Sequence, residues 1–173
     1  MGSLHDLRPT SPSYATEPVA DAFDWADASA ELVSGAWYLV VFRSVRRLDA
    51  DETRLNELDD AAHLEASRAP GFVHYFKGPK ADDGTCLSFC IWDSRAQARS
   101  GAGMPAHREA VMVLDEMYAA YTLEFLRMGR AHAGAPLIFE AYDRLPAAIA
   151  PPVGDMLAFP PAAPGFDPAL APS

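Results

Sequence analysis

Cysteine, basic residues and long hydrophobic runs are all scarce in this sequence. Cys86 and Cys90 are its two cysteines, four residues apart on a predicted strand, which separates them by about 13 Å at a rise of ~3.3 Å per residue. A disulfide requires Cα atoms within about 7 Å, so the two cannot be bridged. Their spacing also differs from that of a Cys-x-x-Cys metal clip, so we expect them to be small strand fillers.

The deficit of basic residues argues against polyanionic partners. Lys and Arg number 14 against 24 Asp and Glu, for a formal charge of -10. Nucleic acid and anionic membranes both require a cationic surface, so neither is an expected partner. No apolar run approaches the roughly 20 residues that span a bilayer, and residues 1–10 have no apolar signal core. We therefore expect a cytoplasmic protein.

Composition divides the chain into three parts. Residues 1–35 are rich in Pro, Ser and Asp. This composition predicts an extended arm that docks through Tyr14, Phe23 and Trp25. Residues 36–144 carry regular strand and helix patterns. Residues 145–173 form a Pro/Ala-rich tail whose prolines exclude helix and central strand. We expect one folded domain between two extensions.

The central part predicts alternating strands and helices. Capping patterns at Asp49/Glu52 and Ser94/Gln97 start two helical segments, and Asp82-Asp83-Gly84 is a hairpin turn. Pro105 starts a further helix, with His107, Val111, Leu114 and Tyr118 on one stripe. β-branched and aromatic residues predict strands over residues 37–45, 72–77, 85–92, 121–128 and 136–142.

This order is the split β-α-β-β-α-β arrangement of ferredoxin-like α+β domains, with an extra C-terminal strand. The first strand is apolar on both sides, with Leu39 and Val41 on one and Tyr38 and Phe42 on the other. Helices on one face of the sheet leave the other apolar face uncovered. We expect a two-fold homodimer in which two sheets close on each other.

Several segments together resemble one known superfamily: WYLVVFRSV, the helix ending in APGF, the HYF strand, LSFCIWDSRAQAR and PAHREAVMVLDEMY. Over residues 36–142 they are similar to the antibiotic-biosynthesis-monooxygenase-like dimeric α/β barrels. The resemblance implies that barrel and a pocket for a small aromatic, hydrophobic ligand. The superfamily includes cofactor-free oxygenases of aromatic polyketides, haem-degrading enzymes and members of no known activity.

The haem-degrading members use an Asn on the first strand, a Trp after the third strand and an iron-binding His on the second main helix. His107 matches that histidine, whereas Arg43 stands at the Asn position and residues 98–101 contain no Trp. The resemblance thus implies haem binding through His107, without haem degradation, as an alternative.

Three polar residues are the catalytic candidates. His107 lies near a helix N-terminus, where the macrodipole keeps the imidazole neutral and able to accept a proton, although it could equally be a satisfied histidine at the core edge. His74 is expected on the strand face of Phe72 and Phe76, in a pocket or a dimer seam. Arg43 interrupts an apolar strand and needs an anion, either from a substrate or from Asp93, Glu124 or the other subunit.

Aromatic side chains supply the candidate substrate contacts, and at helical or strand spacing such residues are more commonly core. These candidates are Tyr75, Trp92, Tyr118, Tyr121 and Phe89. The chain has no Gly-x-Ser-x-Gly elbow, Gly-rich phosphate loop or dinucleotide fingerprint. The leading hypothesis is cofactor-independent oxygenation of a phenol or enol, with His107 or His74 as base and Arg43 or Tyr75 as oxyanion donor. The alternatives are a haem-binding protein and a non-catalytic assembly module that uses the arm and the tail.

Overall fold

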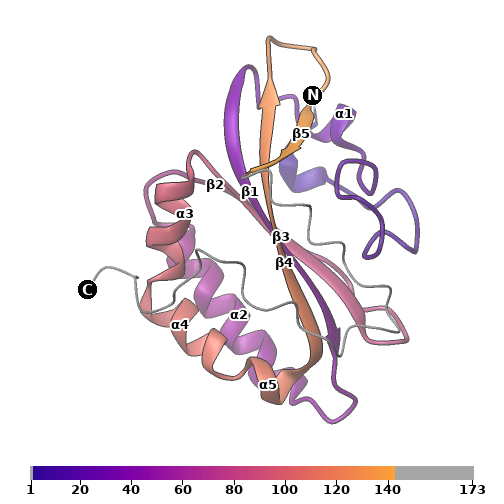
Figure 1. The fold of residues 1–173 in the computed structure, drawn as a ribbon, viewed down its shortest axis with the longest axis vertical. Helices are drawn as coiled ribbons and strands as arrows, with labels where there is room; N and C mark the ends of the chain where they lie inside the picture. Colours follow the sequence, from indigo (N-terminus) through magenta and orange to yellow (C-terminus); the bar gives the residue numbers. More distant parts are fainter. Residues whose placement is uncertain (1, 143–173) are drawn as a thin grey trace.

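The chain folds into a five-stranded antiparallel sheet with helices on one face and the N-terminal arm on the other (Figure 1). The computed structural model describes residues 2–142. The strand order is β2-β3-β1-β4-β5, which confirms the expected ferredoxin-like α+β arrangement with an added C-terminal strand. In chain order the elements are η1 (Leu4–Asp6), α1 (Trp25–Ala28), β1 (Gly35–Arg46), α2 (Glu52–Ala66), β2 (Phe72–Lys77), β3 (Thr85–Trp92), α3 (Arg95–Ala102), α4 (Pro105–Met112), α5 (Leu114–Met117), β4 (Tyr118–Arg130) and β5 (Ile138–Ala141).

Strand β1 is the centre of the sheet because it pairs along its length with both β3 and β4. Val41 stands opposite Phe89 on one side and Glu124 on the other. Its near-continuous apolar sequence suits this position, since both of its faces are covered. Side chains alternate between two faces, which we name the arm face (Leu39, Val41) and the helix face (Tyr38, Phe42).

Of the two predicted helix N-caps, one is confirmed by the structure and the other is wrong. Ser94 caps α3 as predicted, with its Oγ accepting from the Gln97 N–H at 3.3 Å. The cap of α2 is Asp51, whose Oδ1 accepts from the Arg54 N–H at 3.0 Å, so the predicted cap at Asp49 is wrong by two residues. Asp49 instead forms an ion pair with Arg47 in the preceding turn.

The predicted continuous helix from Pro105 to Tyr118 is interrupted. Helix α4 ends at Met112, Val113 leaves helical geometry with φ -105° and ψ 8°, and α5 is a single further turn. Tyr118 is the first residue of β4, paired with Arg46 across a bulge in the β1–β4 ladder. Strand pairing therefore removes Tyr118 from the helical stripe on which His107 was expected to lie.

A β-bulge in β2 changes the face on which Phe72 lies. The register places Phe72 opposite Trp92 but His74 opposite Ile91, so the strand gains one residue at Val73. Phe72 consequently packs with Trp92 on the helix face, at 5.3 Å between ring centroids, rather than with His74. The alternation holds from His74 onward, with Tyr75 on the helix face.

The arm face of the sheet is covered by the arm of the same chain, which corrects the expectation of an uncovered face. Tyr14, Phe23 and Trp25, the three rings predicted to dock, are all at most 6% exposed. They share one core cluster with the sheet residues Leu39, Val41, Leu87, Phe89, Ile91 and Met128. Burial of each large apolar side chain contributes roughly 1.5–3 kcal/mol, so the arm adds a second hydrophobic layer to the fold.

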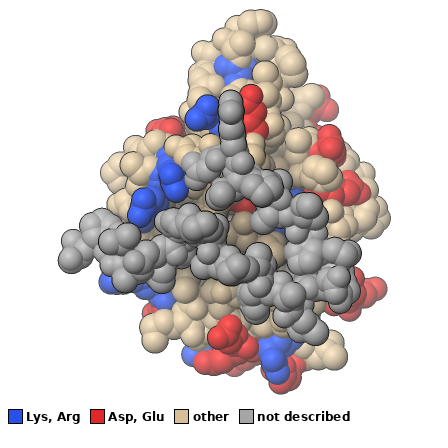
Figure 2. All heavy atoms as spheres, viewed as in Figure 1, with Lys and Arg blue, Asp and Glu red and all other residues tan. Residues whose placement is uncertain are grey.

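No helix within residues 2–142 is long and apolar enough to cross a membrane. Figure 2 shows acidic and basic side chains interspersed around the rim of the face it presents. The predicted tail, residues 145–173, lies outside the described residues.

Candidate functional site

The sheet separates the predicted site residues into two groups that do not share a cavity. Arg43, His74 and Phe89 lie on the arm face, because each stands opposite an arm-face residue in the strand register. The remaining sheet candidates lie on the helix face: Tyr75, Trp92, Tyr118 and Tyr121. His107 belongs to neither group, since it projects from α4.

Arg43 is engaged by protein groups on all sides. Its guanidinium forms a buried ion pair with Glu124 on β4 and donates to the backbone carbonyls of Ala15 and, at 2.7 Å, Glu17. Of the two predicted kinds of anionic partner, the structure contains the protein carboxylate, Glu124. Arg43 therefore secures the arm to the sheet.

His74 is buried beneath the arm and uncharged. It is 5% exposed, and its Nε2 has no hydrogen-bond partner among the described residues. Burial, reinforced by the nearby His5, lowers the pKa of His74 to about 4. The His5 ring lies edge-on at 5.3 Å between centroids. His74 consequently faces the arm core and not the helix side of the sheet.

His107 lies on the exposed surface of α4, in its first turn, where Pro105 is at the predicted first helical position. The adjacent Ala106 N–H donates to Glu65 of α2 at 2.9 Å, which fixes this end of α4. His107 lines neither of the two cavities described below. These surroundings do not fit a haem, which requires an enclosed apolar slot around its axial ligand.

The polar groups on the helix face converge on one cleft between α2 and the sheet. It encloses about 20 Å³, which is room for about one water molecule. The cleft, named here the helix-side cleft, is lined by Phe42, Ser44, Arg46, Leu55, Asn56, Asp59, Tyr75, Lys77, Cys86, Ser88 and Tyr118.

A carboxylate with two partners forms one wall of the helix-side cleft. The Tyr75 hydroxyl donates to Asp59 Oδ1 at 2.5 Å, and Lys77 Nζ lies 2.8 Å from Asp59 Oδ2. That second contact is an ion pair by distance without hydrogen-bond geometry, so Asp59 Oδ2 is buried with no hydrogen-bond partner among the described residues. Burial, with the adjacent Asp59 charge, strongly raises the pKa of Tyr75 and keeps its phenol protonated.

An arginine donor faces the same cleft. Arg46 is held by Glu52, which also accepts from Lys80, so one carboxylate orients the guanidinium. Its Nε is buried and has no partner among residues 2–142. Nearby, burial raises the pKa of Tyr118 to about 12 and also raises that of the Cys86 thiol, so both side chains are neutral at pH 7.

Sequence reasoning predicted Tyr75 and Tyr118 in a pocket but missed Asp59 and Arg46. The available signal was the helical spacing of Leu55 and Asp59, which places a carboxylate one turn along the buried stripe of α2. Arg46 ends β1 next to a bulge, and its cleft-facing position depends on the pairing with β4.

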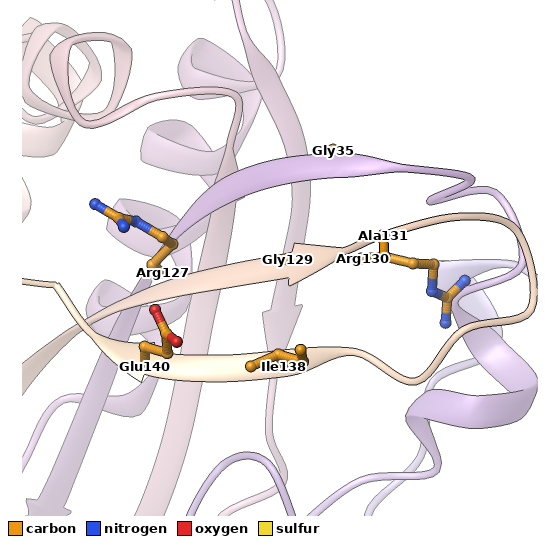
Figure 3. A pocket seen from close by; sticks show the side chains of 7 residues that line it. All are labelled: Gly35, Arg127, Gly129, Arg130, Ala131, Ile138 and Glu140. Carbon is orange, nitrogen blue, oxygen red and sulfur yellow. The ribbon is translucent and has the colours of Figure 1, made fainter.

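A larger hollow of about 230 Å³ lies at the far end of β4 and β5 (Figure 3). Glycine residues 35 and 129 line it, and its two arginines, Arg127 and Arg130, point away from each other. Its one carboxylate, Glu140, stands opposite Arg127 in the β4–β5 register, so opposite charges already face each other there. We therefore place the candidate site in the helix-side cleft.

Fold and site together define a ferredoxin-like α+β protein with a polar cleft under its first long helix and a sheet covered by its own arm. The chain belongs to the PB2B2.08-like family, whose model matches residues 1–138, the arm included. It is similar to UPF0643 protein PB2B2.08 of Schizosaccharomyces pombe, with 29% identity over 144 residues, covering 73% of this chain and 66% of that protein. The chain therefore spans slightly less than two thirds of this relative.

Several solved structures are similar in fold to about half of the chain. Rv0793 from Mycobacterium tuberculosis is 23% identical with a TM-score of 0.47, covering 52% of this chain and 92% of its own. SnoaB, a cofactor-independent oxygenase from Streptomyces nogalater, is 15% identical with a TM-score of 0.41, covering 52% and 91%.

Proposed function

We propose that the chain is a small-molecule enzyme that binds a phenol or enol in the helix-side cleft, deprotonates it and lets the anion react directly with oxygen. One observation carries this proposal: a buried acceptor, Asp59 Oδ2, and a buried donor, Arg46 Nε, both lack hydrogen-bond partners among the described residues and line the same cleft. Buried polar groups are nearly always hydrogen-bonded in folded proteins. An acceptor whose contact is the Lys77 ion pair, facing a donor without a hydrogen-bond partner, suits a hydroxyl that loses its proton.

Each group has a distinct role. Asp59 accepts the substrate proton, while Tyr75 and Lys77 hold its carboxylate in place. Arg46 donates to the oxyanion that forms, and Glu52 holds the guanidinium in position. Phe42 and Tyr118, whose ring centroids lie 5.2 Å apart, supply an aromatic wall for a flat substrate. An aromatic ring exceeds about 20 Å³, so binding requires side chains at the cleft mouth to move.

The reaction is balanced without a cofactor. The substrate transfers a proton to Asp59, and the resulting carbanion forms a C–O bond to O₂, which is reduced to a carbon-bound peroxide. The peroxide O–O bond then breaks as the same carbon loses its remaining hydrogen, leaving a carbonyl. The departing hydroxide takes the proton back from Asp59, so one oxygen atom enters the product and the other leaves as water.

Oxygen uptake with anthrone-like phenols tests the proposal. Asp59→Asn should reduce turnover at least 100-fold, since general-base catalysis contributes about 10²–10⁴-fold. Glu57→Gln is the matched control, because Glu57 is an exposed carboxylate on α2 that does not line the cleft. Product from ¹⁸O₂ should contain one labelled atom. Equal rates for Asp59→Asn and the parent, or no uptake by the parent across a phenol and enol panel, would refute the proposed chemistry.

A further inference from the structure

The helix face of β4 carries an exposed apolar strip next to the point where the described part of the chain ends. We propose that this strip is the docking site of the chain's own Pro/Ala-rich tail, residues 145–173, which lies outside the described residues. The inference depends on the surface of β4 and not on the chemistry of the helix-side cleft, so it stands or falls independently of the proposed function.

The strip, named here the β4 strip, consists of alternate residues of β4 that stand opposite helix-face residues of β1: Tyr121, Leu123 and Phe125. Leu123 and Phe125 are 39% and 37% exposed, so the described helices leave this part of the helix face accessible. Aromatic rings of β1 flank the strip. Phe42 is stacked on Tyr121 at 5.6 Å, and Tyr38 is stacked on Phe125 at 6.1 Å between ring centroids. Contiguous exposed apolar surface of this kind marks an interaction site.

The outer edge of β4 beside the strip has no strand partner within residues 2–142. Strand β5 pairs with residues 126–129, whereas β4 begins at Tyr118. The Tyr142 N–H donates to the Phe125 carbonyl at 3.0 Å, so the chain still follows the edge of β4 where its described part ends. The Tyr142 ring lies 4.8 Å from that of Tyr38. The following residues therefore leave the sheet directly beside the β4 strip.

The composition of the tail suits an aromatic surface. Pro146 has no N–H to donate, so it prevents the tail from continuing β5 as a paired strand along β4. Pro-rich segments favour the extended polyproline conformation, and grooves lined with aromatic side chains are their usual binding sites. The strip from Tyr121 to Phe125 is about 13 Å long at ~3.3 Å per residue. About five tail residues cover that length at ~3.1 Å each, so residues 145–173 are more than long enough.

The covalent link makes the tail the favoured occupant. A segment joined to its binding site by a short connection has an effective concentration on the order of millimolar. The tail begins three residues after Tyr142, which itself lies against the strip. A second copy of the chain, or a separate Pro-rich protein, would have to reach a comparable concentration to displace it.

Photo-crosslinking of the full chain tests which segment covers the strip. Leu123→p-benzoylphenylalanine places a probe in the middle of the strip. Trypsin releases the tail as one peptide, residues 145–173, because it follows Arg144 and contains no Lys or Arg. In an equal mixture of ¹⁵N-labelled and unlabelled chains, we expect crosslinks between the probe and this peptide, each of a single isotope.

The control probe is Val33→p-benzoylphenylalanine, because Val33 is a 55% exposed apolar residue outside the strip. It should give no crosslink to the tail. Mixed-isotope products from the Leu123 probe would assign the strip to a second copy, and the absence of any crosslink to the tail would leave it to a separate partner. Either result overturns the proposal.

A polar substitution in the strip tests whether the contact is apolar. Phe125→Ser in the chain with the Leu123 probe should lower the yield of the tail crosslink about fivefold or more, since it removes apolar surface from the contact. Ile138→Ser, at a 56% exposed apolar residue of β5, should leave the yield within about twofold. If Phe125→Ser does not fold, Phe125→His keeps a ring beside Tyr38 and makes the same test. An unchanged yield in a folded Phe125 variant would overturn docking on this strip.

Discussion

Arg43 on β1 and Glu124 on β4 form a buried ion pair on the arm face of the sheet, at the point where the arm crosses it. Their side chains are 7% and 19% exposed. Glu124 supplies the charge that allows Arg43 to remain buried while its other nitrogens hold the arm. The pair therefore links the sheet ladder to a segment more than twenty residues away in sequence.

Removing the carboxylate should destabilise the fold. Glu124→Gln leaves the buried guanidinium without its counter-charge, and we expect a loss of about 2–4 kcal/mol in the free energy of unfolding, measured by urea denaturation. Glu140→Gln, on an exposed carboxylate of β5, should change it by less than about 0.5 kcal/mol. Equal effects for the two variants would show that the ion pair adds nothing to stability.

A methyl group at residue 101 should disturb the packing of α3 on the sheet. A Cβ on Gly101 would lie 2.4 Å from the Trp92 ring, and Trp92 is 3% exposed. Gly101→Ala should therefore cost about 1–3 kcal/mol through overpacking, despite the better helix propensity of Ala. Gly103→Ala, whose nearest atom would be the Ser100 carbonyl oxygen at 3.4 Å, should be close to neutral. A higher urea midpoint for Gly101→Ala than for the parent would contradict the close approach.

Acid should weaken the fold through His74. Its folded pKa of about 4 lies below the ordinary value of 6.5, so between these pH values the unfolded chain binds a proton that the folded chain does not. The free energy of unfolding should therefore be highest above pH 6.5 and fall as the pH drops toward 4. The total loss should be about 3 kcal/mol at most, with no further loss from His74 below pH 4. His5, Glu31 and His63 are the neighbouring charged groups that modulate this shift.

Substitution of His74 tests whether this residue causes the pH dependence of stability. His74→Gln should flatten the stability profile between pH 4 and 6.5, as followed by urea unfolding at several pH values. His132→Gln, on an exposed histidine in the β4–β5 turn, should leave the profile as in the parent. An identical slope for the parent and His74→Gln would exclude His74 as its source.

His107 should be dispensable for turnover if Asp59 is the base. Because His107 is exposed on α4 and outside the helix-side cleft, we expect His107→Ala to retain oxygen uptake within about twofold of the parent. The same variant tests the original sequence hypothesis. A large loss of turnover with an unchanged urea midpoint would restore His107 as the base and displace Asp59.

The sequence by itself determined the order of strands and helices, because hydrophobic periodicity, the Asp82-Asp83-Gly84 turn and the Ser94 cap are local signals. It also indicated that Tyr14, Phe23 and Trp25 dock, since isolated rings in a polar segment need burial. Predictions from local patterns failed where pairing between strands changed the position of a residue. The bulge at Val73 places Phe72 on the helix face, and pairing with Arg46 makes Tyr118 the first residue of β4.

Tertiary structure alone decided which residues meet. Asp59, Tyr75 and Arg46 come from a helix and two strands, and their convergence depends on how α2 crosses the sheet, which no local pattern encodes. It also decided that the arm of the same chain covers the sheet. Any apolar layer satisfies an apolar face, so the choice between an arm and a second copy depends on long-range contacts such as those of Arg43 and Arg130.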